Sequence, residues 1–268
     1  MSPRAMGRVR GWAVGAGVPL AFALLAVLLA FGGAGAPAGA AEPRAARVRA
    51  EASTAVWSVR RTLIRDFASP MRVSSREHTS DPVVFITIDD GVHKDRRALR
   101  YVEAHQIPIT AFLSTWTIKE SAPYFTRLTR WGSIQNHSAT HASLADSATD
   151  LDHEICQSQR TFAKDFGASP WLLRPPYGVG AGRLEVQVAA ARCGITGMVL
   201  WDAVVGKGRL SVPGGVLRAG DIVLLHFTPT LARDLKVAMA AARRAGLVPA
   251  SLAAYLPDPR PMLPSATP

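Results

Sequence analysis

The chain has 268 residues, of which 48% are hydrophobic, and this supplies enough apolar side chains for one sizeable core or two small ones. Its formal net charge of +11 favours anionic surfaces as partners, such as cell-wall polymers and phospholipid headgroups. Basic residues do not form a run interleaved with aromatics, which argues against a nucleic-acid-binding protein.

The first part of the chain is typical of a secretory signal. Three arginines in the first ten residues precede an apolar stretch, 12–31, that carries no charge, and Ala38-Gly39-Ala40 then fits an A-x-A cleavage site. We therefore predict a signal peptide over residues 1–41 and a secreted or cell-surface protein. The alternative is an uncleaved membrane anchor, since twenty apolar residues can just span a bilayer, and only then would the chain contact a membrane.

A linker is expected next. Residues 42–80 are rich in Ala, Arg and Ser, and within them 45–67 can be arranged as a helix with one loosely apolar side. Asp81-Pro82 breaks the chain, because proline restricts the residue before it. We place a globular domain over 81–257, followed by a proline-rich tail over 258–268.

From Val83 onward, predicted strands alternate with predicted helices. The first strand is continuously apolar, which suits a parallel sheet buried on both faces. The alternation predicts an α/β fold with a parallel sheet that is either closed into a barrel or doubly wound. The predicted strands are 83–88, 109–113, 133–136, 171–174, 196–201, 222–225 and a last one within 247–256; the predicted helices are 94–105, 124–131, 151–166, 184–193 and 231–245.

Polar residues stand where the predicted strands end. In parallel α/β folds, functional side chains gather at the carboxyl ends of the strands, so we expect these segments to meet at one site. They are Asp89-Asp90, His137, Arg174, Trp201-Asp202 and His226.

One group of candidate residues has the side-chain types of a metal site: Asp89, Asp90, His137 and His141. One carboxylate and two imidazoles form a common three-ligand set that leaves one coordination position for water, and a second carboxylate can then act as a base. Adjacent aspartates cannot share a face of a strand, but a turn at Gly91 lets both reach one site. Four residues of spacing put both imidazoles on one side of a helical turn. Ser138 stands where a zincin-type metalloprotease needs Glu. The alternative is a simple Asp-Asp-Gly turn and two surface histidines.

Two further segments carry groups for catalysis. Arg174 precedes two prolines that stiffen the backbone, and its guanidinium can hold a carboxylate through a bidentate pair and keep it ionised. His226 ends an apolar strand and can act as a general acid near neutral pH. A surface arginine on a rigid turn and a core histidine are the alternatives.

The two cysteines, Cys156 and Cys193, leave two possibilities open. In an exported protein a pair suggests a disulfide, but two buried thiols on separate helices fit the sequence equally well.

Taken together and in this order, the segments between Pro82 and Leu256 resemble the polysaccharide deacetylase family, also called the NodB-homology fold. Thr87-Ile88-Asp89-Asp90-Gly91 is similar to the family's T-F-D-D motif, and His137-Ser138-x-x-His141 to its H-S/T-x-x-H motif. Arg174-Pro175-Pro176-Tyr177 is similar to R-x-P-Y, and Leu224-Leu225-His226 to L-x-H. The resemblance implies a distorted (β/α) barrel.

The resemblance also implies a hydrolase that removes acetyl groups from N-acetylated sugars of peptidoglycan or a chitin-like polysaccharide. Its cofactor would be a divalent metal, zinc in the first place, with cobalt or manganese as alternatives. The implied roles are these: Asp90, His137 and His141 as metal ligands, Asp89 as general base, Arg174 orienting Asp89, the Tyr177 backbone N–H at the oxyanion, and His226 as general acid.

One stretch departs from the family pattern. The family has D-x-x-D-W after the strand at Trp201, but here Asp202 is followed by no Asp-Trp pair, and Lys207 stands close to the expected second aspartate. Trp201 and Asp202 remain candidates for the substrate-binding wall. Two other functions therefore stay open: an O-acetyl esterase on xylan or another acetylated glycan, and a non-catalytic wall-binding protein on the same fold.

Overall fold

A computed structural model describes residues 71–260 of the chain. The predicted signal peptide and the predicted helix over 45–67 lie outside these residues, as does most of the tail. No helix within the described residues combines the length and apolar character needed to cross a bilayer.

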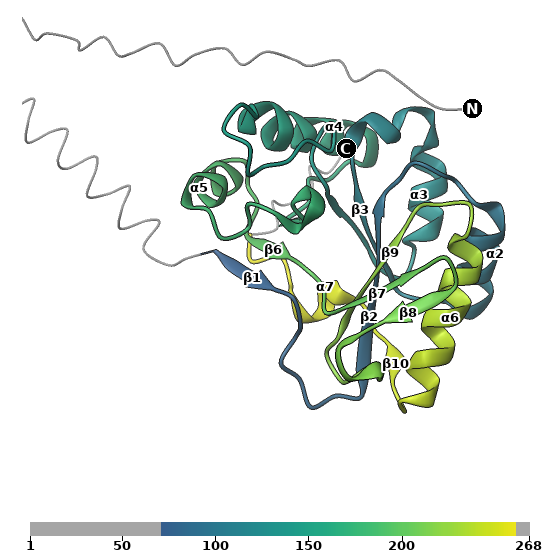
Figure 1. The fold of residues 1–268 in the computed structure, drawn as a ribbon. Helices are drawn as coiled ribbons and strands as arrows, with labels where there is room; N and C mark the ends of the chain where they lie inside the picture. The colour runs from purple at the N-terminus through teal and green to yellow at the C-terminus, as the bar shows by residue number, and fades with distance from the viewer. Residues whose placement is uncertain (1–70, 261–268) are drawn as a thin grey trace, which may run out of the picture. The chain divides into compact units, whose positions relative to one another are not determined.

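The fold is a mixed α/β structure built around a curled, half-barrel sheet, as Figure 1 shows. The strand order is β1-β6-β5-β4-β3-β2-β9-β7-β8, with β10 joining β2 separately. Among the strand pairs within residues 71–260, only β7 with β8 is antiparallel. The predicted fold class, a distorted (β/α) barrel, is confirmed. The strands are β1 (Arg72–Ser74), β2 (Val83–Asp90), β3 (Ile109–Leu113), β4 (Ser133–Asn136), β5 (Leu172–Leu173), β6 (Gly197–Val199), β7 (Ala203–Gly206), β8 (Arg209–Ser211), β9 (Ile222–His226) and β10 (Val248–Pro249).

Helices cover the outer face of the sheet. In Figure 1, α2, α3 and α6 lie together on one side of β2 and β9, whereas α4 and α5 lie at the other end of the sheet. Each helix predicted within the described residues is found, with shifts of a few residues at its ends, but the one predicted over 151–166 begins as a π-helical segment (Asp152–Gln157). The helices are α2 (Arg96–His105), α3 (Ala122–Leu128), α4 (Ser158–Phe166), α5 (Leu184–Arg192), α6 (Leu231–Arg244) and α7 (Leu252–Tyr255).

Strand β2 is buried on both faces, and its side chains alternate between the hydrophobic core under the helices and the inner face that leads to the candidate site. Ile86 and Ile88 point outward into the core shared with α2 and α6, and burying side chains of this size contributes about 1.5–3 kcal/mol each. Phe85 belongs to a second core cluster inside the curl of the sheet. Because residues two apart share a face, Thr87 and Asp89 continue this inner face toward the strand end.

Three strands differ from the sequence expectations. Strand β1 lies within residues 42–80, the expected linker, and pairs with β6. Strands β7 and β8 form a hairpin that is not among the predicted elements, and Lys207 and Gly208 at its tip have φ values of 52° and 78°. Positive φ at both turn residues matches the twist of a two-residue hairpin, and the Gly206-Lys207-Gly208 sequence is the signal that could have revealed it.

Cys156 and Cys193 form a disulfide, with Cα atoms 4.8 Å apart and a separation of 37 positions in the sequence. This bond joins the π-helical segment to the end of α5 and answers the question that the sequence left open. Disulfides in proteins persist chiefly in oxidising compartments.

Replacing both cysteines by alanine should lower the free energy of unfolding by about 3–4 kcal/mol, because a loop of this length then regains its freedom in the unfolded chain. Urea denaturation of the variant and of the oxidised and reduced wild type measures this. Oxidised wild type and variant with equal midpoints would contradict a stabilising role for the bond.

Candidate active site

The end of β2 turns sharply, and this brings two adjacent carboxylates to one site. Asp90 and Gly91 have φ values of 81° and 92°, so the chain leaves the strand in the left-handed region. A Cβ atom at Gly91 would overlap Thr117 Oγ1, whose hydroxyl donates to the Asp90 carbonyl at 2.9 Å. The turn therefore requires glycine at position 91 and is fixed by Thr117.

His137 and His141 lie on an irregular loop after β4, so the predicted helical turn is wrong. Ser138 and His141 have φ values of 71° and 67°, and the His141 backbone N–H donates to Ser138 Oγ at 3.0 Å. Thr140 donates from its N–H and its hydroxyl to buried Glu154, at 3.0 and 2.6 Å. Burial alone would raise the pKa of Glu154, but these hydrogen bonds lower it by more, so the net shift is downward. The Glu154 carboxylate therefore holds the loop in place through Thr140.

The loop brings both imidazoles to Asp90. Oδ1 of Asp90 lies 3.4 Å from His137 Nε2 and 3.2 Å from His141 Nε2. One potential ligand atom from each of these three residues lies within 4.8 Å of the other two. Burial raises the pKa of Asp90, but the two imidazoles lower it more, and the Asp90 carboxylate beside His141 raises the pKa of that histidine.

The donor set of this cluster fits a divalent metal. His137 Nδ1 lies 2.7 Å from the Arg174 carbonyl, so it carries the proton and leaves the lone pair of Nε2 facing Asp90. His141 Nδ1 lies 3.3 Å from the Tyr177 hydroxyl. Asp90 Oδ1 is buried, and neither imidazole is aligned to donate to it, so it has no hydrogen-bond partner within residues 71–260. Converging, unpaired electron-donor atoms are what a bound cation requires.

Asp89 lies apart from this set and is held by Arg174. Both side chains are buried, and Arg174 Nη1 donates to Asp89 Oδ1 at 2.6 Å. Asp89 Oδ2 lies 3.6 Å from His137 Nε2, so its free oxygen faces the cluster. Because a single guanidinium nitrogen makes the contact, the expected bidentate pair is not formed.

Arg174 is fixed in place by its other donors and by an aromatic ring. Nε donates to the Val199 carbonyl at 3.1 Å and Nη2 to the Leu200 carbonyl at 3.0 Å. The guanidinium carbon lies 4.2 Å from the ring centroid of Phe112. Burial lowers the pKa of Arg174, and the adjacent Asp89 carboxylate opposes that shift.

Thr87 is part of the site and is not among the residues predicted from the sequence. Its hydroxyl accepts from Arg174 Nη1 at 2.8 Å and donates to the Val223 carbonyl at 2.8 Å. The alternation of side chains along a strand could have revealed it, since Thr87 lies two residues before Asp89 and therefore shares its face of β2.

His226 lies beside the two aspartates on the neighbouring strand. It ends β9 and pairs in register with Asp89 of β2. It lines a pocket of about 530 Å³ together with Asp90 and Lys207, the residue at the tip of the β7–β8 hairpin. Lys207 therefore lies in the pocket where the family resemblance led us to expect a second aspartate, and the Asp234 carboxylate lines the same pocket.

The remaining candidates are Tyr177, Trp201 and Asp202, and none of them lines this pocket. Tyr177 has a φ of 60°, its residue is 65% exposed, and its ring centroid lies 4.7 Å from that of His141. Trp201 lies against Gly178, where an added Cβ would be 3.0 Å from the indole ring. Asp202 does not line the pocket, and within the described residues its side chain makes no hydrogen bond or ion pair.

Replacing Arg174 by methionine should lower the free energy of unfolding by about 3–5 kcal/mol, because the buried Asp89 carboxylate would lose its charged partner. Urea denaturation checks this, with Arg127→Ala as the control. Arg127 pairs with Glu103 at an exposed site, where such a pair contributes about 0.2–1 kcal/mol. Equal losses in both variants would contradict the structural importance assigned to the buried pair.

Comparison with known proteins agrees with this arrangement. The family model described as polysaccharide deacetylase matches residues 76–198, which include Asp89, Asp90, His137, His141 and Arg174 but not His226. An uncharacterized protein of Streptomyces coelicolor is 37% identical over 154 residues. That alignment covers 54% of this chain and 59% of the relative, so the chain spans little more than half of that protein's length.

Solved structures share the fold at low sequence identity. A family 4 carbohydrate esterase (CE4) pseudoenzyme from Bacillus anthracis is 20% identical with a TM-score of 0.59, covering 71% of this chain and 70% of its own. A peptidoglycan N-acetylglucosamine deacetylase, solved with a hydroxamate-type benzamide, is 19% identical with a TM-score of 0.59, covering 70% of this chain and 94% of its own. Both likenesses establish the fold.

Proposed function

Since the chain belongs to the polysaccharide deacetylase family through residues 76–198, we propose that it is a metal-dependent hydrolase acting on N-acetylated sugars of peptidoglycan or a chitin-like polymer. One observation carries the proposal. Asp90, His137 and His141 each place one potential ligand atom within 4.8 Å of the other two, and Asp90 Oδ1 has no hydrogen-bond partner within residues 71–260. Asp89 is held separately by Arg174, with its other oxygen facing His137.

The protein side chains divide the work in the proposed reaction. Asp90, His137 and His141 would hold the metal, which when bound supplies a water of pKa about 7 and polarises the acetyl carbonyl. Asp89 would accept the proton of the attacking water at Oδ2, because Oδ1 is occupied by Arg174. The Arg174 guanidinium holds Asp89 in the orientation that this step needs.

Two further groups would act on the leaving amine and on the oxyanion. His226 would protonate the departing amine, which leaves poorly as an anion. The backbone N–H of Tyr177 would donate to the tetrahedral oxyanion, and loss of one such donor typically costs about 10²–10³-fold in rate. Pro175 and Pro176 make the Tyr177 turn rigid, which suits a preorganised donor.

Zinc is the metal we propose, with cobalt or manganese as alternatives, because two imidazoles and one carboxylate with an open position suit these ions. We also propose that the protein works outside the cytoplasm. The Cys156–Cys193 disulfide supports this, since such bonds are rare in reducing compartments.

The position of Lys207 supports a second candidate function, that of a wall-binding protein without catalytic turnover. A lysine beside His226 does not supply the carboxylate that the family pattern places there, and the fold is shared with a protein described as a pseudoenzyme. An O-acetyl esterase would use nearly the same site but depend less on His226, because an alkoxide leaves more easily than an amine.

An acetate-release panel distinguishes these functions. The zinc-loaded chain is incubated with peptidoglycan, chitooligosaccharide and acetylxylan, with and without EDTA. We expect acetate from an N-acetylated polymer, abolished by EDTA. Acetate from acetylxylan alone indicates the esterase, and binding to insoluble wall without acetate indicates the non-catalytic protein.

A further inference from the structure

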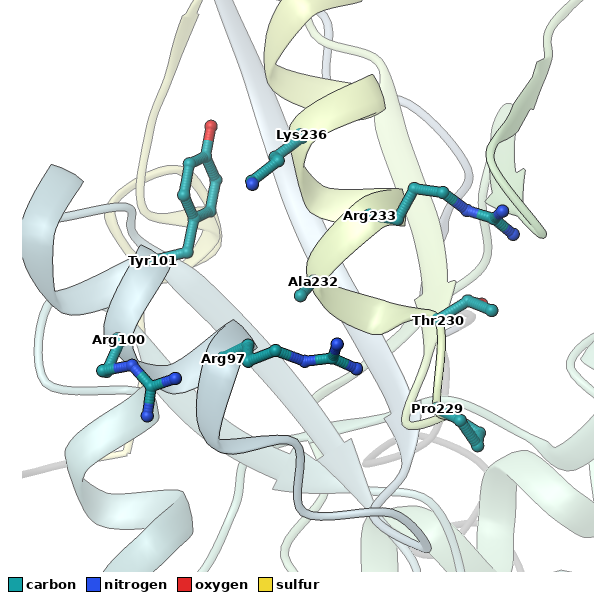
Figure 2. Close-up of a pocket in the computed structure, with 8 residues that line it drawn as sticks. All are labelled: Arg97, Arg100, Tyr101, Pro229, Thr230, Ala232, Arg233 and Lys236. Carbon is teal, nitrogen blue, oxygen red and sulfur yellow. The ribbon is translucent and has the colours of Figure 1, made fainter.

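A cationic cleft lies between α2 and α6, outside the candidate metal site. Figure 2 shows four basic side chains from the two helices around it, with Tyr101 beside Lys236. The cleft has a volume of about 590 Å³. The basic residues are Arg97 and Arg100 of α2 and Arg233 and Lys236 of α6.

These cations are poorly neutralised by the fold. Arg97 lies 3.5 Å from Asp95, but the same Asp95 oxygen accepts the Arg97 backbone N–H at the start of α2. Among residues 71–260, no carboxylate lies within 4 Å of the charged groups of Arg100, Arg233 or Lys236. Like charges gathered in one cleft repel each other, so an anionic ligand would relieve a cost that folding leaves in place.

The cleft adjoins the pocket that contains Asp90 and His226. Pro229 and Thr230 line both cavities. Arg233 lies against the tip of the β7–β8 hairpin, since a Cβ at Gly208 would be 2.8 Å from its Nε. Lys207 in the pocket and Arg233 beside the hairpin therefore add positive charge next to the cleft, although Asp90 and Asp234 also line the pocket.

We propose that this cleft binds the phosphate groups of a phosphodiester polymer, an anionic wall glycopolymer whose acetylated sugar lies at the metal site. Guanidinium groups bind phosphate through paired hydrogen bonds, and the tetrahedral phosphate lets groups from α2 and α6 approach different oxygens. A planar carboxylate presents its two oxygens on one edge and fits two facing helices less well. The placing of the sugar rests on the proposed deacetylase function; the binding of phosphate does not.

The test measures binding of poly(glycerol phosphate) to the full chain by calorimetry at low and high salt. The double variant Arg100→Glu, Lys236→Glu is compared with Lys164→Glu, Arg192→Glu, which makes the same change in net charge at exposed positions on α4 and α5. We expect the first to weaken binding by at least about tenfold, through loss of two charge-assisted contacts, and the second to have a much smaller effect. Thermal unfolding of both variants checks that they are folded.

Parallel ligands identify the source of the phosphate. Inorganic phosphate should bind the same site more weakly, and binding of the polymer should weaken as salt rises. Polygalacturonate bound as tightly as the phosphate polymer, or phosphatidylglycerol vesicles bound more tightly through the same residues, would overturn the proposal, as would equal losses in the two double variants. This binding assay does not depend on acetate release. If the protein binds the polymer but releases acetate from none of the glycans, the proposed deacetylase function is wrong and the proposed phosphate-binding cleft still stands.

Discussion

Asp89→Asn is expected to lower the turnover number for acetate release by about 10²–10⁴-fold, the usual contribution of a positioned general base. Asparagine keeps the shape of the side chain, so Arg174 Nη1 retains an oxygen acceptor where it now contacts Asp89 Oδ1. The amide nitrogen, however, cannot accept a proton from water. The measurement is steady-state acetate release by the zinc-loaded variant on the substrate that the panel identifies.

The control for Asp89→Asn is Thr87→Val, which removes another acceptor of Arg174 without touching a carboxylate. We expect a smaller loss in this variant, because Arg174 keeps its contacts with Asp89, Val199 and Leu200. Comparable turnover in Asp89→Asn and wild type would show that proton transfer does not pass through Asp89.

His141→Ala is expected to have the second large effect, a fall in metal affinity of more than about 100-fold, with activity recovering only in excess zinc. Removing a residue that only hydrogen-bonds to a metal ligand usually lowers metal affinity by about 10–100-fold. We expect a larger fall here because a ligand itself is removed. His141 is partly exposed at a loop, so its loss should disturb the fold less than loss of buried His137. Competition with a zinc chelator gives the affinity.

Tyr177→Phe is the matched control for His141→Ala. It removes the hydroxyl that lies 3.3 Å from His141 Nδ1 but keeps the ring and the imidazole. The affinity should fall by no more than about 10–100-fold, as for an outer neighbour of a ligand. Equal zinc affinity in His141→Ala and wild type would exclude His141 from the metal set.

The strand ends could be predicted from the sequence because burial and alternation are local properties. The apolar run of β2 and the predicted β3 and β4 agree with the structure, and with them the places where Asp89, Asp90 and His137 emerge. The way the two imidazoles meet could not be predicted. It depends on positive φ values at Ser138 and His141 and on Glu154, which approaches from a different segment.

Features that depend on long-range closure were also beyond the sequence. The disulfide requires α5 to pack near the π-helical segment, and the cationic cleft joins α2 to α6, more than a hundred residues apart in the chain. The β7–β8 hairpin carries Lys207 into the pocket beside His226, whereas the family pattern alone pointed only to a missing aspartate. Only the folded sheet places these segments side by side.

The division of the two adjacent carboxylates into base and ligand is the central claim, and metal content tests it most directly. Asp89→Asn and Asp90→Asn are purified side by side, loaded with zinc, dialysed and measured by inductively coupled plasma mass spectrometry. We predict about one zinc per chain in Asp89→Asn, because Asp89 is bound to Arg174, and a large loss in Asp90→Asn, because Asp90 Oδ1 faces both imidazoles. Zinc retained by Asp90→Asn and lost by Asp89→Asn would contradict the account by reversing the two roles.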